Sequence, residues 1–280
     1  MMGQVAFSLF GILVILLLIG VPISVSVGAA AAATILFCYP DLPVMVIAQR
    51  LFTSMDNVSI MAIPFFVLAG NLMTNGGISK MIVEFVNCFV GNIRGGLGYA
   101  AIVACAFFAA LSGSAPATVL AISSMLYPEM VKLGYPKERC AGLLAVSGGL
   151  GPVIPPSIIM VVYCTLTGAS VTNMFTVGIF VGILIALILS AEVFYFSHRE
   201  AWPRMDGKLD YSQIWKKFVR AFPALLMPVI ILGSIYSGLM TPTESSATAV
   251  LYAFLIGVFV YRQLKIRDLP KIILNSAKSA

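Results

Sequence analysis

Charged residues are scarce in this sequence. Asp, Glu, Lys and Arg make up only 10% of its 280 residues, whereas a soluble domain carries about 25%. Residues 1–40, 95–128 and 141–191 contain none. A helix that crosses a bilayer needs about 20 apolar residues. Uncharged runs of this length argue against a soluble domain and predict a multi-pass integral membrane protein.

Two further absences narrow the class. Alternating polar and apolar runs of about 10 residues, which are typical of membrane barrels, do not occur. Because backbone polar groups in hydrocarbon must be satisfied within the protein, we expect an all-α fold. Clusters of His, Asp or Glu inside the apolar runs are missing as well, and His198 is the single histidine. The sequence therefore disfavours an enzyme, while a channel stays an alternative.

Cysteine gives no sign of metal or disulfide chemistry. The five cysteines are scattered through apolar sequence and form no CxxC pair. We therefore interpret them as small buried hydrophobic residues.

The positive charge is concentrated late in the chain. The net charge is +6, and most Lys and Arg residues follow His198, in the stretches 199–220 and 262–278. Such clusters are typical of cytoplasmic loops of membrane proteins. We predict a basic cytoplasmic loop at 198–220 and no nucleic-acid partner.

Two of the apolar segments are interrupted by helix-breaking residues. The segment 97–127 is interrupted at Ser112–Pro116, and the segment 140–167 at Gly148–Ser157. A straight helix over 97–127 would be about 46 Å long, which exceeds a hydrocarbon core of about 30 Å. We predict a re-entrant helical hairpin over 97–127 and an unwound transmembrane helix over 140–167.

The second interruption should release backbone oxygens. Proline has no N–H, so in a continued helix Pro152, Pro155 and Pro156 would free the carbonyls of Gly148, Gly151 and Pro152. Oxygen ligands of this kind suit a hard cation.

The first interruption should add hydroxyl groups and a helix start. Ser112 and Ser114 supply hydroxyls, Gly113 permits close approach of a neighbour, and Pro116 favours a helix beginning there. A helix N-terminus suits a carboxylate, and Thr118 adds another hydroxyl. Two broken segments of this kind predict a shared site for a small solute or ion. The alternative is a pair of proline-kinked helices that satisfy each other.

Several motifs together carry a family resemblance. Over nearly its whole length the chain resembles the large membrane subunit of tripartite ATP-independent periplasmic (TRAP) transporters. The motifs that carry the resemblance, in order, are Ile63–Gly70, Arg94–Leu97, Ser112–Ala115, Gly134-Tyr135, Gly151–Ser157 and Thr241–Glu244.

The resemblance implies an inverted-repeat, elevator-type secondary transporter in the bacterial inner membrane. It implies Na⁺ as coupling ion, a small membrane subunit and a periplasmic solute-binding protein as partners, and an organic acid as substrate: a dicarboxylate, keto acid, sugar acid or sialic acid. A carboxylate transporter of related fold that needs no binding protein is the alternative.

The resemblance also assigns the site. The Na⁺ candidates, with Gly148 added by the carbonyl count, are Ser112, Gly113, Ser114, Gly148, Gly151, Pro152 and Pro155. The substrate candidates are Ser114, Ala115, Thr118 and Ser157.

The expected organisation has four regions. Residues 1–93 form scaffold helices that end in an amphipathic helix, and residues 94–197 form the transport region. After the loop at 198–220, residues 221–280 return to the scaffold with an amphipathic connector. The family has a second half with its own hairpin, so we expect this chain to be an N-terminal part.

Overall fold

The computed structural model describes residues 2–40, 42–43, 45–56, 58–90, 93–204 and 211–279. In these ranges the regular structure is helical, as the sequence predicts, and no strand occurs. The chain divides into two compact units, residues 1–57 and 58–280. We describe each unit by itself.

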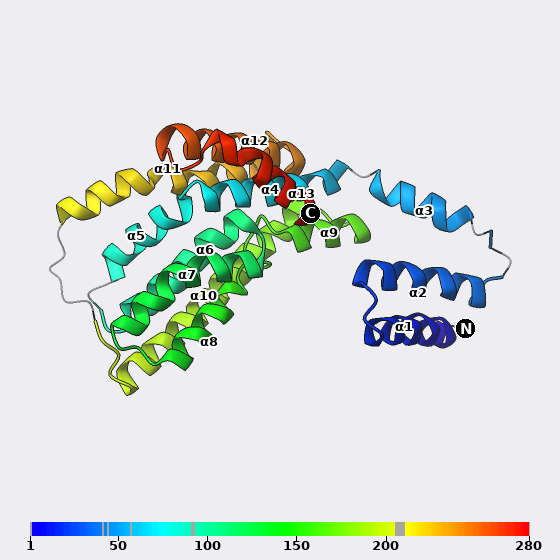
Figure 1. Cartoon of the computed structure of the whole chain (residues 1–280), viewed down its shortest axis with the longest axis horizontal. Helices are drawn as coiled ribbons and strands as arrows, with labels where there is room; N and C mark the ends of the chain where they lie inside the picture. The colour runs from blue at the N-terminus through cyan, green and yellow to red at the C-terminus, as the bar shows by residue number, and fades with distance from the viewer. Residues whose placement is uncertain are drawn as a thin grey trace. The chain divides into compact units, whose positions relative to one another are not determined.

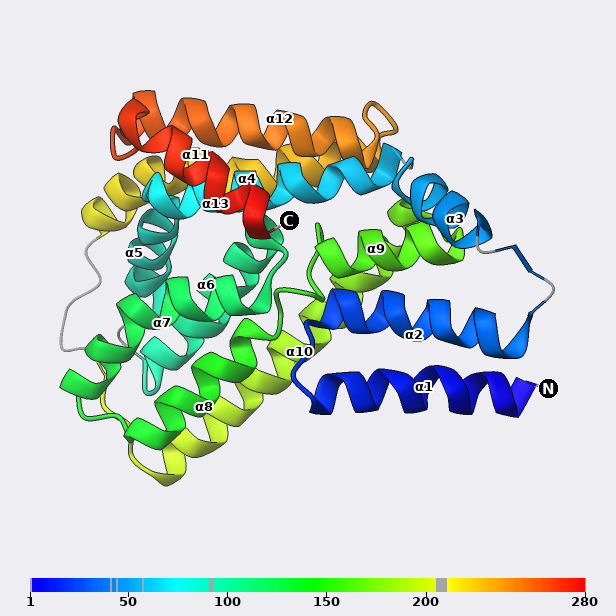
Figure 2. The same ribbon diagram turned by 45° about the vertical axis from the view of Figure 1, so that its right-hand side comes forward.

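The apolar sequence before Tyr39, in the first unit, folds into two helices. Helices α1 (Met2–Leu18) and α2 (Ile23–Cys38) are separate and lie side by side (Figures 1 and 2). Gly20 turns the chain with φ +86°, a conformation that glycine adopts without a steric penalty. A third helix, α3 (Met45–Met55), occupies sequence that reads as a polar link.

The second unit contains a group of helices drawn from both ends of its sequence. It consists of η1 (Val58–Met61), α4 (Ala62–Asn75), α11 (Tyr211–Tyr236), α12 (Pro242–Leu255), the π-helical turn η2 (Ile256–Val260), η3 (Ile266–Asp268) and α13 (Leu269–Ser279). Helix α4 packs on α12 and α13 around a core that includes Phe66, Met73 and Ile231.

Helix α12 begins with a capping box that contains Glu244, one of the two predicted caps, and Thr241 in place of Thr243. The Thr241 hydroxyl accepts from the Glu244 N–H at 3.3 Å, and the Glu244 carboxylate accepts from the Thr241 N–H at 2.8 Å. The sequence predicts Thr243 and Glu244 as caps. The Thr243 hydroxyl instead donates to the Val58 carbonyl, 2.9 Å away, and so ties the start of α12 to η1.

The amphipathic helix α5 (Ile78–Val90) packs against both α6 and α11. Its Lys80 and Glu84 side chains form an i,i+4 ion pair at 3.9 Å. The apolar face is buried through Ile82 and Val86. The pattern of the sequence therefore predicts this helix correctly.

The remaining helices form a bundle (Figure 2). It consists of α6 (Gly96–Ser112), α7 (Ala115–Lys132), α8 (Lys137–Gly148), α9 (Ile158–Thr167) and α10 (Val171–Arg199). Helices α6 and α7 form a helical hairpin, and both pack on α8. Their core includes Phe108, Ile122 and Leu144. Helix α7 runs through Pro128 to Lys132, beyond the end predicted at Tyr127.

Aromatic and charged side chains join the open end of the hairpin to α10. Trp202 is buried against Tyr135, with ring centroids 5.2 Å apart. The Tyr135 hydroxyl accepts from the Leu97 N–H at 3.4 Å. Glu200 accepts from the Trp202 indole N–H at 2.9 Å and pairs with Arg139 at 3.2 Å. This end of the bundle is therefore held by contacts from four segments of the chain.

Four segments of the described chain are long and apolar enough to cross a membrane: residues 58–75, 171–199, 214–236 and 242–260. Helices α1, α2, α6 and α9 are apolar but shorter. The predicted basic loop 198–220 is shorter in the structure, because α10 extends to Arg199 and α11 begins at Tyr211. Residues 205–210 of that loop lie outside the described residues.

Candidate functional site

The first helix break is a tight reversal at the hairpin tip. Helix α6 ends at Ser112, and Gly113 has the left-handed conformation φ +59°, ψ 12°. Ser114 is extended and precedes the first residue of α7, Ala115, with Pro116 in the first turn. Glycine is favoured at the reversal, and proline is tolerated in a first turn, whose N–H groups have no intrahelical partner. The predicted break is confirmed.

Hydroxyl groups hold the tip together from inside. The Thr118 hydroxyl lies 2.8 Å from the Ser114 carbonyl, to which it donates, and 3.0 Å from the Ser112 hydroxyl. Both Ser112 and Thr118 are buried. The Ser114 side chain makes no capping hydrogen bond to α7, although serine commonly makes one at this position.

The second break follows Gly148, where α8 ends, and reaches Ser157, before α9. The prediction that the Gly148 carbonyl is free is wrong, because the chain tightens into a turn and this oxygen accepts from the Gly151 N–H at 3.0 Å. The same prediction for Gly151 and Pro152 agrees with the structure. Within the described ranges, the Gly151 and Pro152 carbonyls accept no backbone hydrogen bond.

The two breaks are in direct contact. A side-chain carbon on Gly151 would lie 2.7 Å from the Ser114 carbonyl carbon and 2.8 Å from the Ala115 nitrogen. One on Gly113 would lie 2.8 Å from the Pro156 carbonyl oxygen. Each glycine thus lets the backbone of one break touch the backbone of the other, a separation too small for any side chain.

Two buried hydroxyls that flank the second break in the sequence are unpaired. Ser147 and Ser157 are both fully buried, and in the described part of the chain their hydroxyl oxygens have no hydrogen-bond partner. Ser157 precedes α9 without capping it, and its α-carbon lies beside Gly113. A buried hydroxyl without a partner is unfavourable by about 1–3 kcal/mol. Such groups are candidates for binding an ion, a water molecule or a substrate.

Four helix ends meet here, and their partial charges differ. Helices α6 and α8 end at the breaks, so their C-terminal carbonyls carry partial negative charge, whereas α7 and α9 begin there with partial positive charge. The first pair favours a cation and the second pair an anion. Among the described residues no group of three His, Cys, Asp or Glu side chains could hold a metal. A cation at this position would therefore depend on neutral oxygens, which fits Na⁺.

The structure brings most of the predicted site residues together. Ser112, Gly113, Ser114, Ala115 and Thr118 form the tip, and Gly151, Pro155 and Ser157 are buried in the facing break. Pro152 is half-buried. A side-chain carbon on Gly148 would meet the Val119 side chain of α7 and not the backbone of the tip.

Ser147 is a candidate that the sequence reasoning missed. It is in the last turn of α8, one residue before the break. A serine at the end of a helix that stops in a Gly-Gly pair was the available signal. Its lack of a partner depends on packing, which composition does not reveal.

Four apolar segments of membrane-crossing length, together with two helix breaks in direct contact, are typical of a polytopic helical membrane protein of the transporter class. Residues 10–280 match the model of the DctM component of the tripartite ATP-independent periplasmic transporters. The chain belongs to this family, whose members are transporters and not enzymes.

Three relatives illustrate the family. The chain is 42% identical to the C4-dicarboxylate TRAP transporter large permease protein DctM of Rhodobacter capsulatus, over 97% of this chain and 64% of the relative. It is 44% identical to the Pseudomonas aeruginosa protein of the same name, over 88% and 57%. It is 36% identical to the sialic acid TRAP transporter permease protein SiaT of Haemophilus influenzae, over 79% and 36%. The chain thus spans about three fifths of the two DctM proteins.

Proposed function

We propose that this chain is part of the membrane component of a Na⁺-coupled secondary transporter that imports an organic acid. One observation carries the proposal: the hairpin tip and the second break touch at Gly151 and Ser114, beside unpaired buried oxygens. The names of the relatives, which include C4-dicarboxylate and sialic acid permeases, support a carboxylate substrate.

The Na⁺ site draws its ligands from both breaks. The Gly151 and Pro152 carbonyls and the Ser157 hydroxyl are oxygens without protein partners among the described residues, and the Ser114 hydroxyl adds a fourth from the tip. Bound there, Na⁺ supplies the positive charge that makes substrate binding depend on the ion gradient. Ser112 and Thr118 hold the tip in shape through the hydrogen bond that joins their hydroxyls.

The substrate carboxylate is placed at the N-termini of α7 and α9. The first-turn N–H groups of both helices donate no hydrogen bond to the side chain of the serine that precedes each helix. These groups suit an anion. Ala115 is the first residue of α7, and Ser157 directly precedes α9. Ser114 belongs to both the Na⁺ site and the substrate site.

The remaining features are also proposed. The α6–α7 hairpin enters the membrane and returns to the same side, and the bundle moves relative to the scaffold in an elevator motion. The basic stretches after His198 support a cytoplasmic location for that side, and the family supports the bacterial inner membrane as the location of the protein. A small membrane subunit and a periplasmic binding protein complete the transporter.

Uptake by the complete transporter tests the coupling. The full-length protein and its partner subunit are reconstituted in proteoliposomes, and the periplasmic binding protein is loaded with labelled C4-dicarboxylate outside. We expect uptake with an inward Na⁺ gradient and little uptake with K⁺ in its place. Equal uptake in the two salts would exclude Na⁺ coupling, and equal uptake without the binding protein would favour the alternative transporter type.

A pair of serine variants tests the site. Ser114→Ala should weaken the dependence of uptake on Na⁺ concentration. The control is Ser124→Ala on the same helix, where the exposed hydroxyl already donates to the Ala121 carbonyl at 3.0 Å. An unchanged Na⁺ dependence in Ser114→Ala contradicts the proposed ligand.

A further inference from the structure

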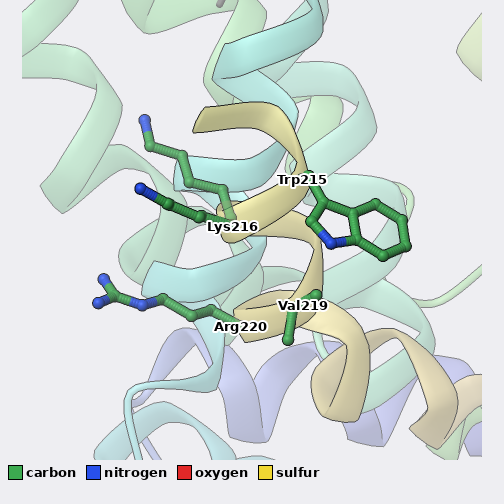
Figure 3. A pocket seen from close by; sticks show the side chains of 5 residues that line it. Trp215, Lys216, Val219 and Arg220 are labelled. Atoms are coloured by element: carbon green, nitrogen blue, oxygen red, sulfur yellow. The ribbon is translucent and has the colours of Figure 1, made fainter. Parts of the chain in front are cut away.

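Three cations at the start of α11 have no acidic partner in the described structure. Lys216, Lys217 and Arg220 lie within about one turn of helix, and the ion pairs found among the described residues are Lys80–Glu84 and Arg139–Glu200. Figure 3 shows the Lys216 and Arg220 side chains extending to the same side of α11, with Trp215 extending to another side. Like charges so close together repel one another and favour an anionic ligand.

The cations line a cavity that shares part of its wall with a second one. The first cavity has a volume of about 520 Å³ and is lined by Trp215, Lys216, Lys217, Val219 and Arg220. The second, of about 360 Å³, shares Val219 and Arg220 with the first. Its other lining residues are Met81, Pro223, Val260, Tyr261 and Gln263. A basic compartment therefore adjoins one with a mixed lining, of which Met81, Pro223 and Val260 form the apolar part.

A hydrogen bond fixes the junction of the two compartments. The Tyr261 hydroxyl, in the wall of the second cavity, donates to the Arg220 carbonyl at 2.7 Å. This bond ties the end of η2 to the basic turn of α11.

The depth of these residues is that of a membrane surface. The apolar segment of α11 suited to cross a membrane begins at Ile214, directly before the basic turn. Trp215 is 66% exposed, and exposed tryptophan is enriched at the level of lipid headgroups. The basic side chains thus lie where phosphate groups are concentrated.

We propose that the joined cavities bind an anionic phospholipid, with its phosphate against Lys216, Lys217 and Arg220 and an acyl chain along Met81, Pro223 and Val260. The guanidinium of Arg220 suits bidentate contact with phosphate oxygens, and the two lysines add point charges. The apolar part of the adjoining compartment, formed by Met81, Pro223 and Val260, favours a lipid over an acidic protein segment. The site is distinct from the proposed transport site at the two breaks.

Lipid retention by the complete transporter tests the proposal. The complex is purified in mild detergent with phosphatidylglycerol or phosphatidylcholine, and the bound lipid is counted by native mass spectrometry. Each basic residue near the surface changes the affinity for anionic lipid about fivefold, so Lys216→Gln/Lys217→Gln/Arg220→Gln should bind phosphatidylglycerol about a hundredfold more weakly. Phosphatidylcholine binding should not change.

A charge-matched variant separates a site from general attraction. Lys265→Gln/Arg267→Gln/Lys271→Gln removes the same charge from the other basic segment and should retain phosphatidylglycerol as the unmodified protein does. Equal loss in the two triple variants overturns the proposal, as does an unmodified complex that shows no preference for phosphatidylglycerol. Loss of the small membrane subunit from the first variant, with lipid retention unchanged, would identify a protein partner and also overturn it.

Discussion

Gly151 and Ser114 touch through their backbones. A side-chain carbon on Gly151 would lie 2.7 Å from the Ser114 carbonyl carbon, closer than two carbon atoms pack. The two residues are on different broken helices, so their contact defines how the breaks fit together. The site therefore depends on this separation as much as on its ligands.

Replacing Gly151 tests that dependence. Gly151→Ala should force the breaks apart, lower the free energy of unfolding by about 1–3 kcal/mol and abolish most Na⁺-driven uptake in proteoliposomes of the complete transporter. Gly142→Ala in α8 is the control, because an added carbon there meets no atom within 4 Å. Similar uptake by both variants would show that the close approach is not needed.

The tip glycine allows strain and crowding to be measured separately. Gly113 and Gly168 both follow a helix in the left-handed conformation, with φ +59° and +73°. Only Gly113 faces another backbone, at Pro156. Both alanine variants should lose about 1 kcal/mol to strain. We expect Gly113→Ala to lose at least about 1 kcal/mol more from crowding, measured by thermal unfolding in detergent. Equal losses would contradict the packing at the tip.

Removing the unpaired hydroxyls should raise the stability of the protein, whereas the glycine replacements should lower it. Without Na⁺, Ser157→Ala and Ser147→Ala should each stabilise the protein by about 1 kcal/mol, because an unsatisfied buried group is removed. Added Na⁺ should raise the thermal midpoint of the unmodified protein, and Ser157→Ala should reduce that rise.

Ser190→Ala is the matched control for these serines. Its hydroxyl donates to the Ala186 carbonyl at 2.7 Å, so its loss should leave the Na⁺ response intact. A Na⁺-induced rise that is the same in Ser157→Ala and in the unmodified protein would exclude Ser157 as a ligand.

Tyr135 should make stability depend on pH in the alkaline range. Burial raises the pKa of Tyr135 to about 12, above its ordinary value of about 10. The unfolded chain therefore releases this proton first, so the stability is complete below about pH 10 and is lost as the pH rises toward 12.

Tyr135→Phe isolates that contribution. The variant loses the hydrogen bond from the Leu97 N–H, which should lower its stability by about 1 kcal/mol at neutral pH. Its thermal midpoint should then fall less steeply than that of the unmodified protein between about pH 10 and pH 12. Parallel curves would contradict the effect of burial on Tyr135.

Local sequence rules predict the breaks well. The run Ser112–Pro116 contains a reversal glycine and a first-turn proline, and α6 and α7 end and begin within it. The amphipathic helix expected at the end of residues 1–93 is α5, whose spacing of Lys80 and Glu84 suits the ion pair that they form. These features depend on neighbouring residues, which the sequence contains in full.

What depends on three-dimensional packing is less predictable. Counting missing N–H groups frees the Gly148 carbonyl, but the chain folds back and the Gly151 N–H bonds to it. Pro128 reads as a helix end, yet α7 continues to Lys132. The Ser147 hydroxyl is unpaired because of the residues that pack around it. Local sequence preferences do not reveal which residues these are.

Ser114 and Ser157 each precede a helix without capping it. The first turns of α7 and α9 therefore leave backbone N–H groups that neither helix satisfies internally. Such amides exchange their hydrogen for deuterium through small local openings, and a ligand bound at the breaks would slow that exchange. The occupancy of the site can thus be followed from deuterium uptake by the chain itself, without a labelled substrate or an ion gradient.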